Sequence, residues 1–538
     1  MVKPLLFRSN YLYFFGLILL VSSLPLSLFL TSLAQFILAG AFFIEGNFIE
    51  KFKRFFRNRT AMIVAGVWLM HVIGLLYTND VAEGIKDLRI KLPLLIFPVV
   101  IAGSEPLSRK QFNWVIAFFI GAVFAGTVVS MGVLTGIIHH EVHDIRDIFI
   151  FHISHIRFAL FTCIAVFALF YFLFSGKYNA SAFEKIVMVV MATWLFIFLL
   201  IMESVTGLSI LLTTATVLLL FAAYRKRKIF FRIALLFLAL LIPASVVYIV
   251  KKYVKEFHVS HAVEINLDEL TARGNPYVFD TANTQLENGY PVWVYINEPE
   301  MQEEWNKRSK LTYQSNDLRG QHIKYTLIRF LTSKGYRKDG EGVMKLTDKE
   351  IHSIEGGIAN VNYQDMTSMK ARLMQVLWEY DLFMEGKNPS GHSVTQRVEF
   401  WKAAAGIIRE HPVIGVGTGD MPGAYSQQYE KTNSRLSPEW RMRAHNQFLA
   451  ITVAFGFAGL AYFLFSLFYP LLREKKFLDY FYFTFWLIVF LSMFTEDTLE
   501  TQPGATFFAF FNSLFLFGRE ILDRQIKNDF SGSKDYTV

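Results

Sequence analysis

Twelve apolar runs separated by short polar segments constrain the fold of this chain more than any other feature. Most of them approach the roughly 20 residues that a helix needs to cross a bilayer. Apolar side chains make up 53% of the sequence and charged ones 18%, which excludes an ordinary soluble enzyme. The sequence therefore predicts an α-helical polytopic membrane protein with spans at residues 11–25, 27–44, 60–77, 92–103, 113–138, 158–174, 185–202, 207–223, 229–250, 445–469, 477–494 and 503–518.

The net charge of +8 belongs to the apolar part of the chain. Residues 251–444 carry 25 Lys and Arg against 25 Asp and Glu, so this longest polar segment is neutral. The excess basic residues lie between the predicted spans, where they set the orientation of a membrane protein. A basic pI often indicates nucleic-acid binding, but this distribution of charge excludes nucleic acid as a partner.

Basic residues gather in alternate loops along the chain. With the N-terminus in the cytoplasm, the loops at 51–59, 225–228 and 473–476 all fall on the cytoplasmic side, as the positive-inside rule requires. Lys3 and Arg8 precede the first apolar run without a convincing cleavage site, which indicates an uncleaved signal anchor. We therefore predict that both termini are cytoplasmic and that the large polar loop is extracytoplasmic.

The predicted organisation has four parts. Nine spans lie within 1–250, a large periplasmic loop domain occupies 251–444, three further spans lie within 445–518, and a cytoplasmic tail covers 519–538. Within the loop, short β-like runs and amphipathic segments alternate with Gly and Asn turns over residues 260–390. This pattern predicts a compact insertion that is either α+β or mostly helical.

An amphipathic helix is expected at residues 394–410, at the end of the large loop. Ser393 and Gln396 have the spacing of a capping box at its start, and Pro412 ends it. The single cysteine, Cys163, lies inside an apolar run, which excludes a disulfide framework and a cysteine metal site.

A basic cluster lies where the large loop returns to the membrane. Arg443 and His445 run directly into the apolar span at 445–469, and Arg397 and Trp401 share a face of the preceding helix. A guanidinium can bind a phosphate with two hydrogen bonds, and histidine can take a proton from a hydroxyl near neutral pH. The pattern predicts a site for chemistry on a lipid-borne anionic substrate. The alternatives are a solvated histidine and an exposed helix arginine.

Two further groups of charged residues lie outside this stretch. Arg157 stands at the start of the span 158–174, on the side where basic residues are rare, so membrane anchoring explains it poorly. Glu496, Asp497 and Glu500 form an acidic patch on the same side. These carboxylates either balance the arginines or hold an acceptor, and a solvated loop is the alternative interpretation.

Five histidines and a glycine-rich loop have simpler interpretations. The spacing of the histidines matches no tight metal-ligand pattern, so we predict a solvated loop and no metal site. The residues GVGTGD at 415–420 follow a helix and no strand, which favours a tight turn over a dinucleotide site. The histidines are His139, His140, His143, His152 and His155.

The stretch from Arg397 to Gly459 resembles the O-antigen ligase / O-antigen polymerase superfamily. The resemblance rests on R-x-x-x-W-x-x-A at Arg397, on GVGTGD, and on R-x-HNQFL followed by G-x-x-G at Gly456 and Gly459. The segments SNDLRG and LTSKGYRKDGEGVMKLT look like the ligase-like branch of Bacteroidetes-type bacteria. The resemblance is strongest over residues 390–460.

This resemblance implies a metal-independent, inverting glycosyltransferase with a GT-C-like fold in the bacterial inner membrane. It implies transfer of a glycan from undecaprenyl diphosphate to a lipid A-core sugar hydroxyl at the periplasmic face, without a cofactor. His445 and Arg397 match the family's catalytic histidine and an arginine. The family's further arginine, in an S-R-G-like turn, is missing at Ser204-Val205-Thr206-Gly207, and Arg157 is expected to supply its charge. The expected substrate-binding residues are Arg443, Asn446, Trp401 and Glu496.

Other functions share parts of this pattern. A polysaccharide polymerase would use the same donor with a second lipid-linked repeat unit as acceptor, and a protein O-oligosaccharyltransferase would use a Ser or Thr hydroxyl. Outside glycosyl transfer, the chain could be a polytopic transporter or an envelope scaffold. The spans show no convincing charged relay and no inverted repeat, which disfavours a transporter.

Overall fold

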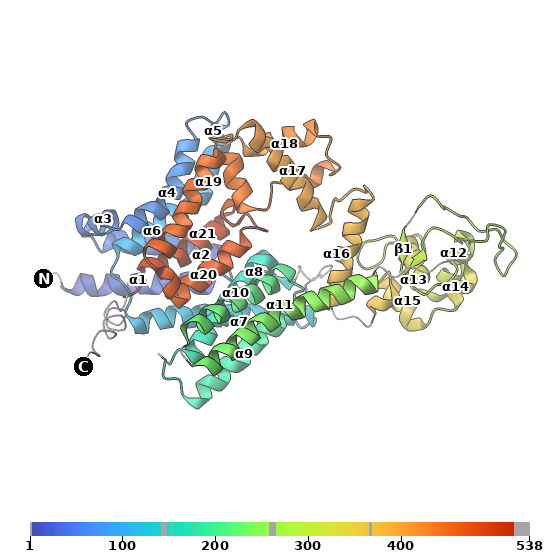
Figure 1. Ribbon diagram of the computed structural model, residues 1–538, viewed down its shortest axis with the longest axis horizontal. Helices are drawn as coiled ribbons and strands as arrows, with labels where there is room; N and C mark the ends of the chain where they lie inside the picture. Colours follow the sequence, from blue (N-terminus) through green and yellow to red (C-terminus); the bar gives the residue numbers. More distant parts are fainter. Residues whose placement is uncertain are drawn as a thin grey trace. The chain divides into compact units, whose positions relative to one another are not determined.

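The structure is a computed structural model that describes residues 3–140, 148–151, 153–176, 178–226, 228–257, 265–283, 285–364 and 368–520 (Figure 1). It is mostly helical and divides into two compact units. Unit 1 comprises Met1–Ile138, Phe149–Arg227 and Leu382–Val538, and unit 2 comprises His139–Ile148 and Lys228–Asp381. His143, His152 and most of the predicted tail lie outside the described residues.

Unit 1 is a bundle of helices contributed by both ends of the chain. Its helices are α1 (Lys3–Ser23), α2 (Leu28–Ile44), α3 (Phe48–Arg57), α4 (Arg59–Gly74), α5 (Val81–Lys91), α6 (Pro93–Gly103), α7 (Arg109–Leu134), α8 (His155–Phe174), α9 (Ala182–Ile201), α10 (Val205–Arg225), α17 (Thr395–Glu410), α18 (Met421–Lys431), α19 (Gln447–Arg473), α20 (Tyr480–Ser492) and α21 (Gln502–Phe517). The short 3-10 turns η3 (Pro438–Trp440), η4 (Lys476–Leu478) and η5 (Thr498–Glu500) lie between the later helices.

Each predicted span contains a helix, and the protein is a polytopic α-helical membrane protein, as predicted. Among the described residues, six helices are each long and apolar enough to cross a membrane alone: α7 to α10, α19, and α11 (Ile229–Phe257) of unit 2. A seventh appears if α2 and α3, which are bent by 113°, count together. The total of twelve spans stays a prediction, because helices such as α6, with 11 residues, are short for a bilayer.

The last three helices pack among the first ones to form the core of unit 1. Helix α21 lies against α6, α19 against α4, and α20 against α8 and α10. Phenylalanine rings also pack α21 edge to face against α7 and α8: the centroids of Phe119 and Phe511 lie 4.9 Å apart, and those of Phe161 and Phe507 lie 5.1 Å apart. This geometry is the preferred one for aromatic pairs.

Helix α17 begins at Thr395 and ends at Glu410, two residues before Pro412, close to the predicted bounds. The predicted capping box at its start is wrong, because the N-cap residue is Val394 and no side chain caps the helix. The N–H of Gln396 instead donates to the carbonyl of His392 at 3.0 Å. The donor that Ser393 was expected to satisfy is therefore already used by the backbone.

The glycine-rich loop, residues 415–420, is a tight turn, as predicted, and it also packs into a break in α19. Gly415 and Gly417 have φ of 68° and 95°, and Gly456 within α19 has φ 63° and ψ −166°. The break at Gly456 leaves backbone groups of α19 without partners inside the helix, and residues in and just before the loop bond to them. Phe457 N–H donates to Pro412 O at 2.8 Å, and Gly417 N–H donates to Ala454 O at 2.9 Å. Both segments thereby satisfy their polar groups inside the bundle.

Replacing Gly456 with alanine is expected to destabilise the protein, because an added Cβ would lie 2.2 Å from the carbonyl carbon of Val413. The backbone conformation is also one that glycine alone adopts readily, and strain of this kind costs about 1–3 kcal/mol. Thermal unfolding in detergent measures the effect. Gly423→Ala in α18 is the matched control, since its Cβ would meet nothing within 4 Å, and an equal loss in both variants would contradict the explanation.

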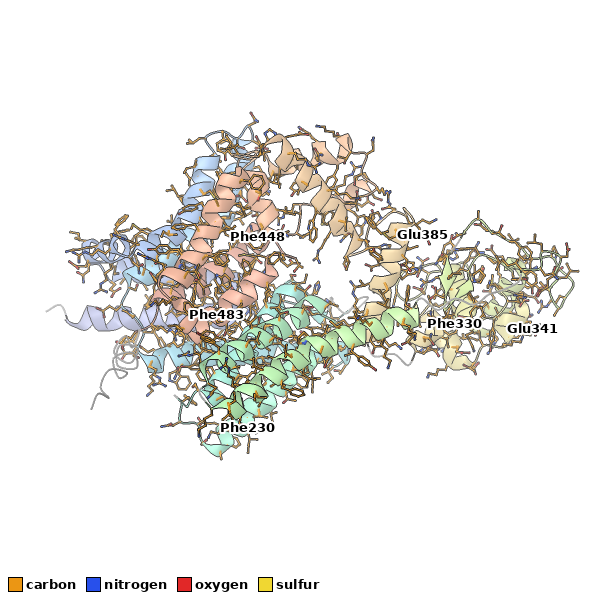
Figure 2. All side chains as sticks on the ribbon, in the orientation of Figure 1. Phe230, Phe330, Glu341, Glu385, Phe448 and Phe483 are labelled. Atoms are coloured by element: carbon orange, nitrogen blue, oxygen red, sulfur yellow. The ribbon has the colours of Figure 1, made fainter. Side chains whose placement is uncertain are left out.

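Unit 2 contains α11, a small insertion and part of α16 (Ser368–Met384). The insertion is mostly helical, with α12 (Glu298–Arg308), α13 (Ile323–Ser333), α14 (Gly340–Met344), α15 (Asp348–Glu355), the turn η2 (Val361–Tyr363), and one antiparallel ladder of β1 (Leu286–Glu287) and β2 (Tyr290–Pro291). Trp305, Leu327 and Phe330 are completely buried in its core, and Figure 2 labels Phe330 on α13. The insertion therefore has a hydrophobic core of its own.

Candidate active site

His445 lies two residues before the start of α19, in a conformation that few non-glycine residues adopt, with φ 46°. Its neighbours fix this conformation from both sides. The indole N–H of Trp401 donates to the carbonyl of Ala444 at 3.0 Å, and the Asn446 side chain caps α19 by accepting from Leu449 N–H at 3.0 Å. Backbone strain that surrounding contacts hold in place is typical of functional sites.

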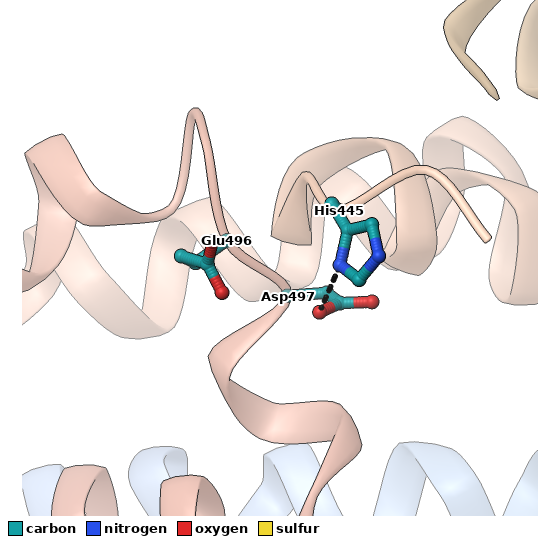
Figure 3. Close-up of side chains that lie close together, drawn as sticks. All are labelled: His445, Glu496 and Asp497. Carbon is teal, nitrogen blue, oxygen red and sulfur yellow. Dashed lines mark hydrogen bonds and ion pairs between the residues drawn. The ribbon is translucent and has the colours of Figure 1, made fainter. Parts of the chain in front are cut away.

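The imidazole of His445 faces the carboxylate of Asp497, with Nδ1 and Oδ1 3.3 Å apart (Figure 3). An ionised carboxylate only accepts hydrogen bonds, so this contact favours the tautomer with the proton on Nδ1. The other ring nitrogen, Nε2, can then accept a proton. Glu496 lies beside Asp497 on the same turn, and Figure 3 shows the three side chains together.

The turn that carries these carboxylates, residues 493–501, is fastened to the start of α19. Gln447 makes three hydrogen bonds to it: its backbone N–H donates to Met493 O at 2.9 Å, its Nε2 to Glu500 Oε1 at 3.0 Å, and its Oε1 accepts from Leu499 N–H at 2.7 Å. The side-chain amide of Asn446 adds a bond to Phe494 O at 2.9 Å. These bonds hold Asp497 in register with His445.

Three arginines from separate elements reach the same turn. Arg397 of α17 pairs with Glu496, Nη2 to Oε1, at 3.1 Å, and Arg443 pairs with Asp497, Nε to Oδ2, at 2.5 Å. Arg157, in the first turn of α8, donates from Nη2 to the Thr501 hydroxyl at 2.7 Å. The site therefore gathers guanidinium groups, two carboxylates and one imidazole at one end of α19.

The pKa values of two acids on this turn, Glu496 and Glu500, are shifted in opposite directions. Burial raises the pKa of Glu496 above its usual range, although Arg397 opposes the shift. Burial would also raise the pKa of Glu500, but Lys91 and Arg443 lower it to about 2. Glu500 therefore stays ionised over the physiological range, whereas Glu496 can exchange a proton at higher pH than a solvated glutamate.

Glu500 belongs to a buried ionic network below the turn. Lys91, the last residue of α5, donates to Glu500 Oε2 at 2.7 Å and to Asp87 Oδ1 at 2.5 Å. Only 2% of the surface of the Lys91 side chain is exposed, and 3% of that of Glu500. Because a buried charge without a partner is costly, this network fixes the position of η5 relative to α5.

The comparison with protein families identifies the segment that contains most of this site. Residues 356–464 match the family model described as O-antigen ligase. This match supports a relation of that segment to the O-antigen ligase superfamily. No curated protein matches the chain. The matched segment includes Arg397, Arg443 and His445, whereas Arg157 and Asp497 lie outside it. The match supports a ligase- or polymerase-like glycosyltransferase role, which in general involves a lipid-linked glycan and a glycan acceptor.

The ligand atoms of His445, Glu496 and Asp497 lie within 4.8 Å of one another, a spacing at which a metal ion can bind. In the structure, however, both carboxylates are already paired with arginines. A divalent cation at this point would lie next to the guanidinium groups of Arg397 and Arg443 and compete with them. The donor set therefore favours recognition of an anion over binding of a cation.

The structure brings together five of the residues expected to form the site: Arg157, Arg397, Arg443, His445 and Glu496. Two other expected site residues contact the backbone instead: the Trp401 indole donates to Ala444 O, and the Asn446 side chain caps α19. Sequence reasoning missed the pairing of Asp497 with His445, although it noted the acidic patch. It also missed Gln447, which stands in the HNQFL motif, and Lys91, for which the sequence offers no signal.

Proposed function

We propose that the protein is an O-antigen ligase-like, inverting glycosyltransferase. It takes a glycan from undecaprenyl diphosphate and transfers it to a lipid A-core sugar hydroxyl at the periplasmic face of the bacterial inner membrane. The observation that carries this proposal is the convergence of the His445–Asp497 pair with three arginines at the end of a membrane-spanning helix. A base beside a set of guanidinium groups suits an acceptor hydroxyl and a diphosphate leaving group.

In this mechanism His445 acts as the general base. Asp497 holds the ring in the tautomer whose Nε2 accepts the proton of the acceptor hydroxyl, and it stabilises the imidazolium that results. The hydroxyl oxygen attacks the anomeric carbon from the face opposite the diphosphate. The new glycosidic C–O bond forms as the bond to the diphosphate oxygen breaks, so the anomeric configuration inverts.

The arginines stabilise the negative charge that develops on the departing diphosphate. Arg397 and Arg443 are paired with Glu496 and Asp497, and these carboxylates keep the guanidinium groups in place in the absence of a donor. When the diphosphate binds, Arg397 is positioned to exchange Glu496 for a phosphate oxygen. The raised pKa of Glu496 makes this exchange easier, because the glutamate can take up a proton as its arginine turns away.

Transfer is expected to continue after divalent cations are removed with EDTA. The reason is that guanidinium groups supply the positive charge that a metal supplies in other glycosyltransferases. The measurement is the rate of glycan transfer by the purified protein in lipid, with EDTA and after addition of Mg²⁺ or Mn²⁺. A rate that falls on chelation and returns with one of these ions would contradict the metal-independent mechanism.

Glycan profiling in a deletion strain tests the proposed function. The strain is complemented with wild type, with His445→Ala, or with His411→Ala as a matched control at the exposed end of α17. Ligation predicts that strains without the chain or with His445→Ala accumulate long lipid-linked polymer and leave the lipid A-core bare. Wild type and His411→Ala should both restore the full-length lipopolysaccharide.

Other outcomes would select another function. If single repeat units appear on the lipid A-core in the absence of activity, the protein is a polymerase and ligation is wrong. If lipid-linked glycans and lipopolysaccharide are unchanged in every strain, transfer to protein hydroxyls or transport replaces ligation. Loss of function in His411→Ala as well as His445→Ala would show that the phenotype reports folding.

A further inference from the structure

Helix α3 follows α2 after a sharp turn that the local sequence requires. The two helices are bent by 113° across a break of three residues that includes Gly46 and Asn47, which have φ of 69° and 52°. Glycine and asparagine are the residues that adopt this left-handed conformation most readily. Helix α2 is mostly apolar and has no charged residue, so if it crosses the bilayer, α3 runs close to the membrane plane.

Buried contacts fix this angle. The ammonium of Lys51, on α3, pairs with Glu45 Oε2 at 2.9 Å, donates to the carbonyl of Phe42, and lies 4.4 Å from the centroid of the Phe42 ring. Gly103 of α6 allows the close approach, because a Cβ there would lie 3.2 Å from Lys51 O. Phe55, one turn further along α3, is buried against α4 and α6. The helix is therefore held rigidly across the end of the bundle.

The rest of α3 presents two different exposed faces. Phe48, Ile49, Phe52 and Phe56 share one face, and between 40% and 84% of each side chain is exposed. Lys53 and Arg57, four residues apart, lie on the next face and are exposed as well. An apolar face beside a basic one, on a short helix that is rich in charged residues, is the pattern of helices that lie in the membrane interface.

Helix α3 lies at the end of the bundle opposite the candidate active site. Helix α4 starts next to α3, and the hydroxyl of Thr60 in its first turn bonds to Glu474, which follows the last residue of α19. The other end of α4 meets the glycine-rich loop, where the Thr418 hydroxyl donates to His71 O at 2.6 Å. His445 precedes the first residue of α19. The two sites therefore face opposite leaflets.

We propose that α3 is an in-plane anchor that binds anionic phospholipids in the leaflet opposite the active site. Its four exposed apolar side chains enter the boundary between head groups and acyl chains, while Lys53 and Arg57 contact lipid phosphates. A membrane surface matches both faces of α3 at once. Its acyl chains can contact the apolar face, and its anionic head groups can contact the basic face beside it. This inference does not depend on the transfer reaction.

Spin labels at two positions test the immersion of α3. The full chain is labelled at Ile49→Cys or at Lys53→Cys and placed in phosphatidylcholine nanodiscs that also contain phosphatidylglycerol; the native Cys163 is buried and stays unlabelled. We expect oxygen, which concentrates in the bilayer, to relax the label at 49 and a water-soluble nickel chelate to relax the label at 53. If the chelate reaches the label at 49 as readily as the one at 53, the apolar face is not in the membrane and the proposal is wrong.

Lipid binding tests the basic face separately. Native mass spectrometry with added phosphatidylglycerol measures the lipid retained by wild type and by the double variant Lys53→Gln/Arg57→Gln. Loss of both charges is expected to weaken phosphatidylglycerol binding about 30-fold, whereas the charge-conserving control Lys53→Arg/Arg57→Lys retains it. Equal retention by the neutral variant and the control would overturn the proposal, as would a preference for phosphatidylcholine. A second protein held on this face in lipid-free detergent would also overturn it.

Discussion

Replacing His445 is expected to slow glycan transfer by about 10²–10⁴-fold, because the reaction loses its general base. Asparagine is a more specific substitution than alanine at this position. His445 has φ 46°, a conformation that asparagine tolerates better than alanine does, so His445→Asn removes the imidazole without adding backbone strain. The measurement is the initial rate of transfer from a lipid-linked donor by purified protein, with the thermal midpoint recorded for each variant.

Asp497→Asn is the companion variant for this experiment. An amide at this position can donate to the ring as well as accept from it, so the histidine is no longer held in one tautomer. We therefore expect a lower rate and a shifted pH profile, in contrast to the flat residual rate of His445→Asn. A His445→Asn protein that folds and transfers glycan at the wild-type rate would show that another group takes the proton.

Breaking the buried ionic network is expected to cost about 3–5 kcal/mol of stability, the usual loss when one member of a buried ion pair is removed. In Lys91→Met, Glu500 stays buried and loses the ammonium partner of its carboxylate, while Arg443 and Gln447 remain nearby. In Glu500→Gln, Lys91 keeps only Asp87 as its ionic partner. The measurement is unfolding in detergent, with Glu439→Gln as a control because that glutamate is exposed.

The double variant Lys91→Met/Glu500→Gln distinguishes a pair from two independent contributions. The double variant is expected to lose less stability than the sum of the two single losses, because both charges of the pair are removed and neither is left buried without the other. Losses that simply add would contradict the direct pairing of the two side chains.

Acid dependence gives a second test of Glu500. Its pKa falls from the ordinary 4.5 to about 2 in the folded protein, so its contribution to stability is complete above pH 4.5 and is lost as the pH falls towards 2. Glu500→Gln should lack this part of the acid dependence. A variant that loses stability with falling pH over this range as steeply as wild type does would contradict the lowered pKa.

Much of the fold follows from local pattern. Every apolar run contains a helix because its backbone polar groups have no other partner in a bilayer. The bend at Gly456 could not be predicted in the same way. Gly456 and Gly459 have the same spacing whether α19 is straight or broken, and the break exists because the glycine-rich loop supplies the missing bonds.

The candidate site divides along similar lines. Arg397, Arg443 and His445 stand in recognisable motifs within about 50 residues of one another, so the sequence places them together. Charge and predicted topology distinguish Arg157 from an ordinary membrane anchor, but its expected place in the site came from the resemblance to the superfamily. The Lys91–Glu500 pair joins residues 409 positions apart, and nothing in the local sequence of α5 distinguishes Lys91 from an ordinary interfacial lysine. Such a contact becomes visible only when the helices are packed.

The interleaved packing of unit 1 has a consequence for how the protein is made. The Gln35 amide of α2 bonds to Thr506 of α21, 471 residues later, and Tyr462 of α19 bonds to the carbonyl of Ile63 in α4, 399 residues earlier. The first helices must therefore remain in the bilayer, without these neighbours, until the ribosome has synthesised the end of the chain. A nascent protein truncated before α19 lacks these contacts and cannot complete the helix bundle. Its incompletely packed helices are then accessible to the membrane quality-control proteases.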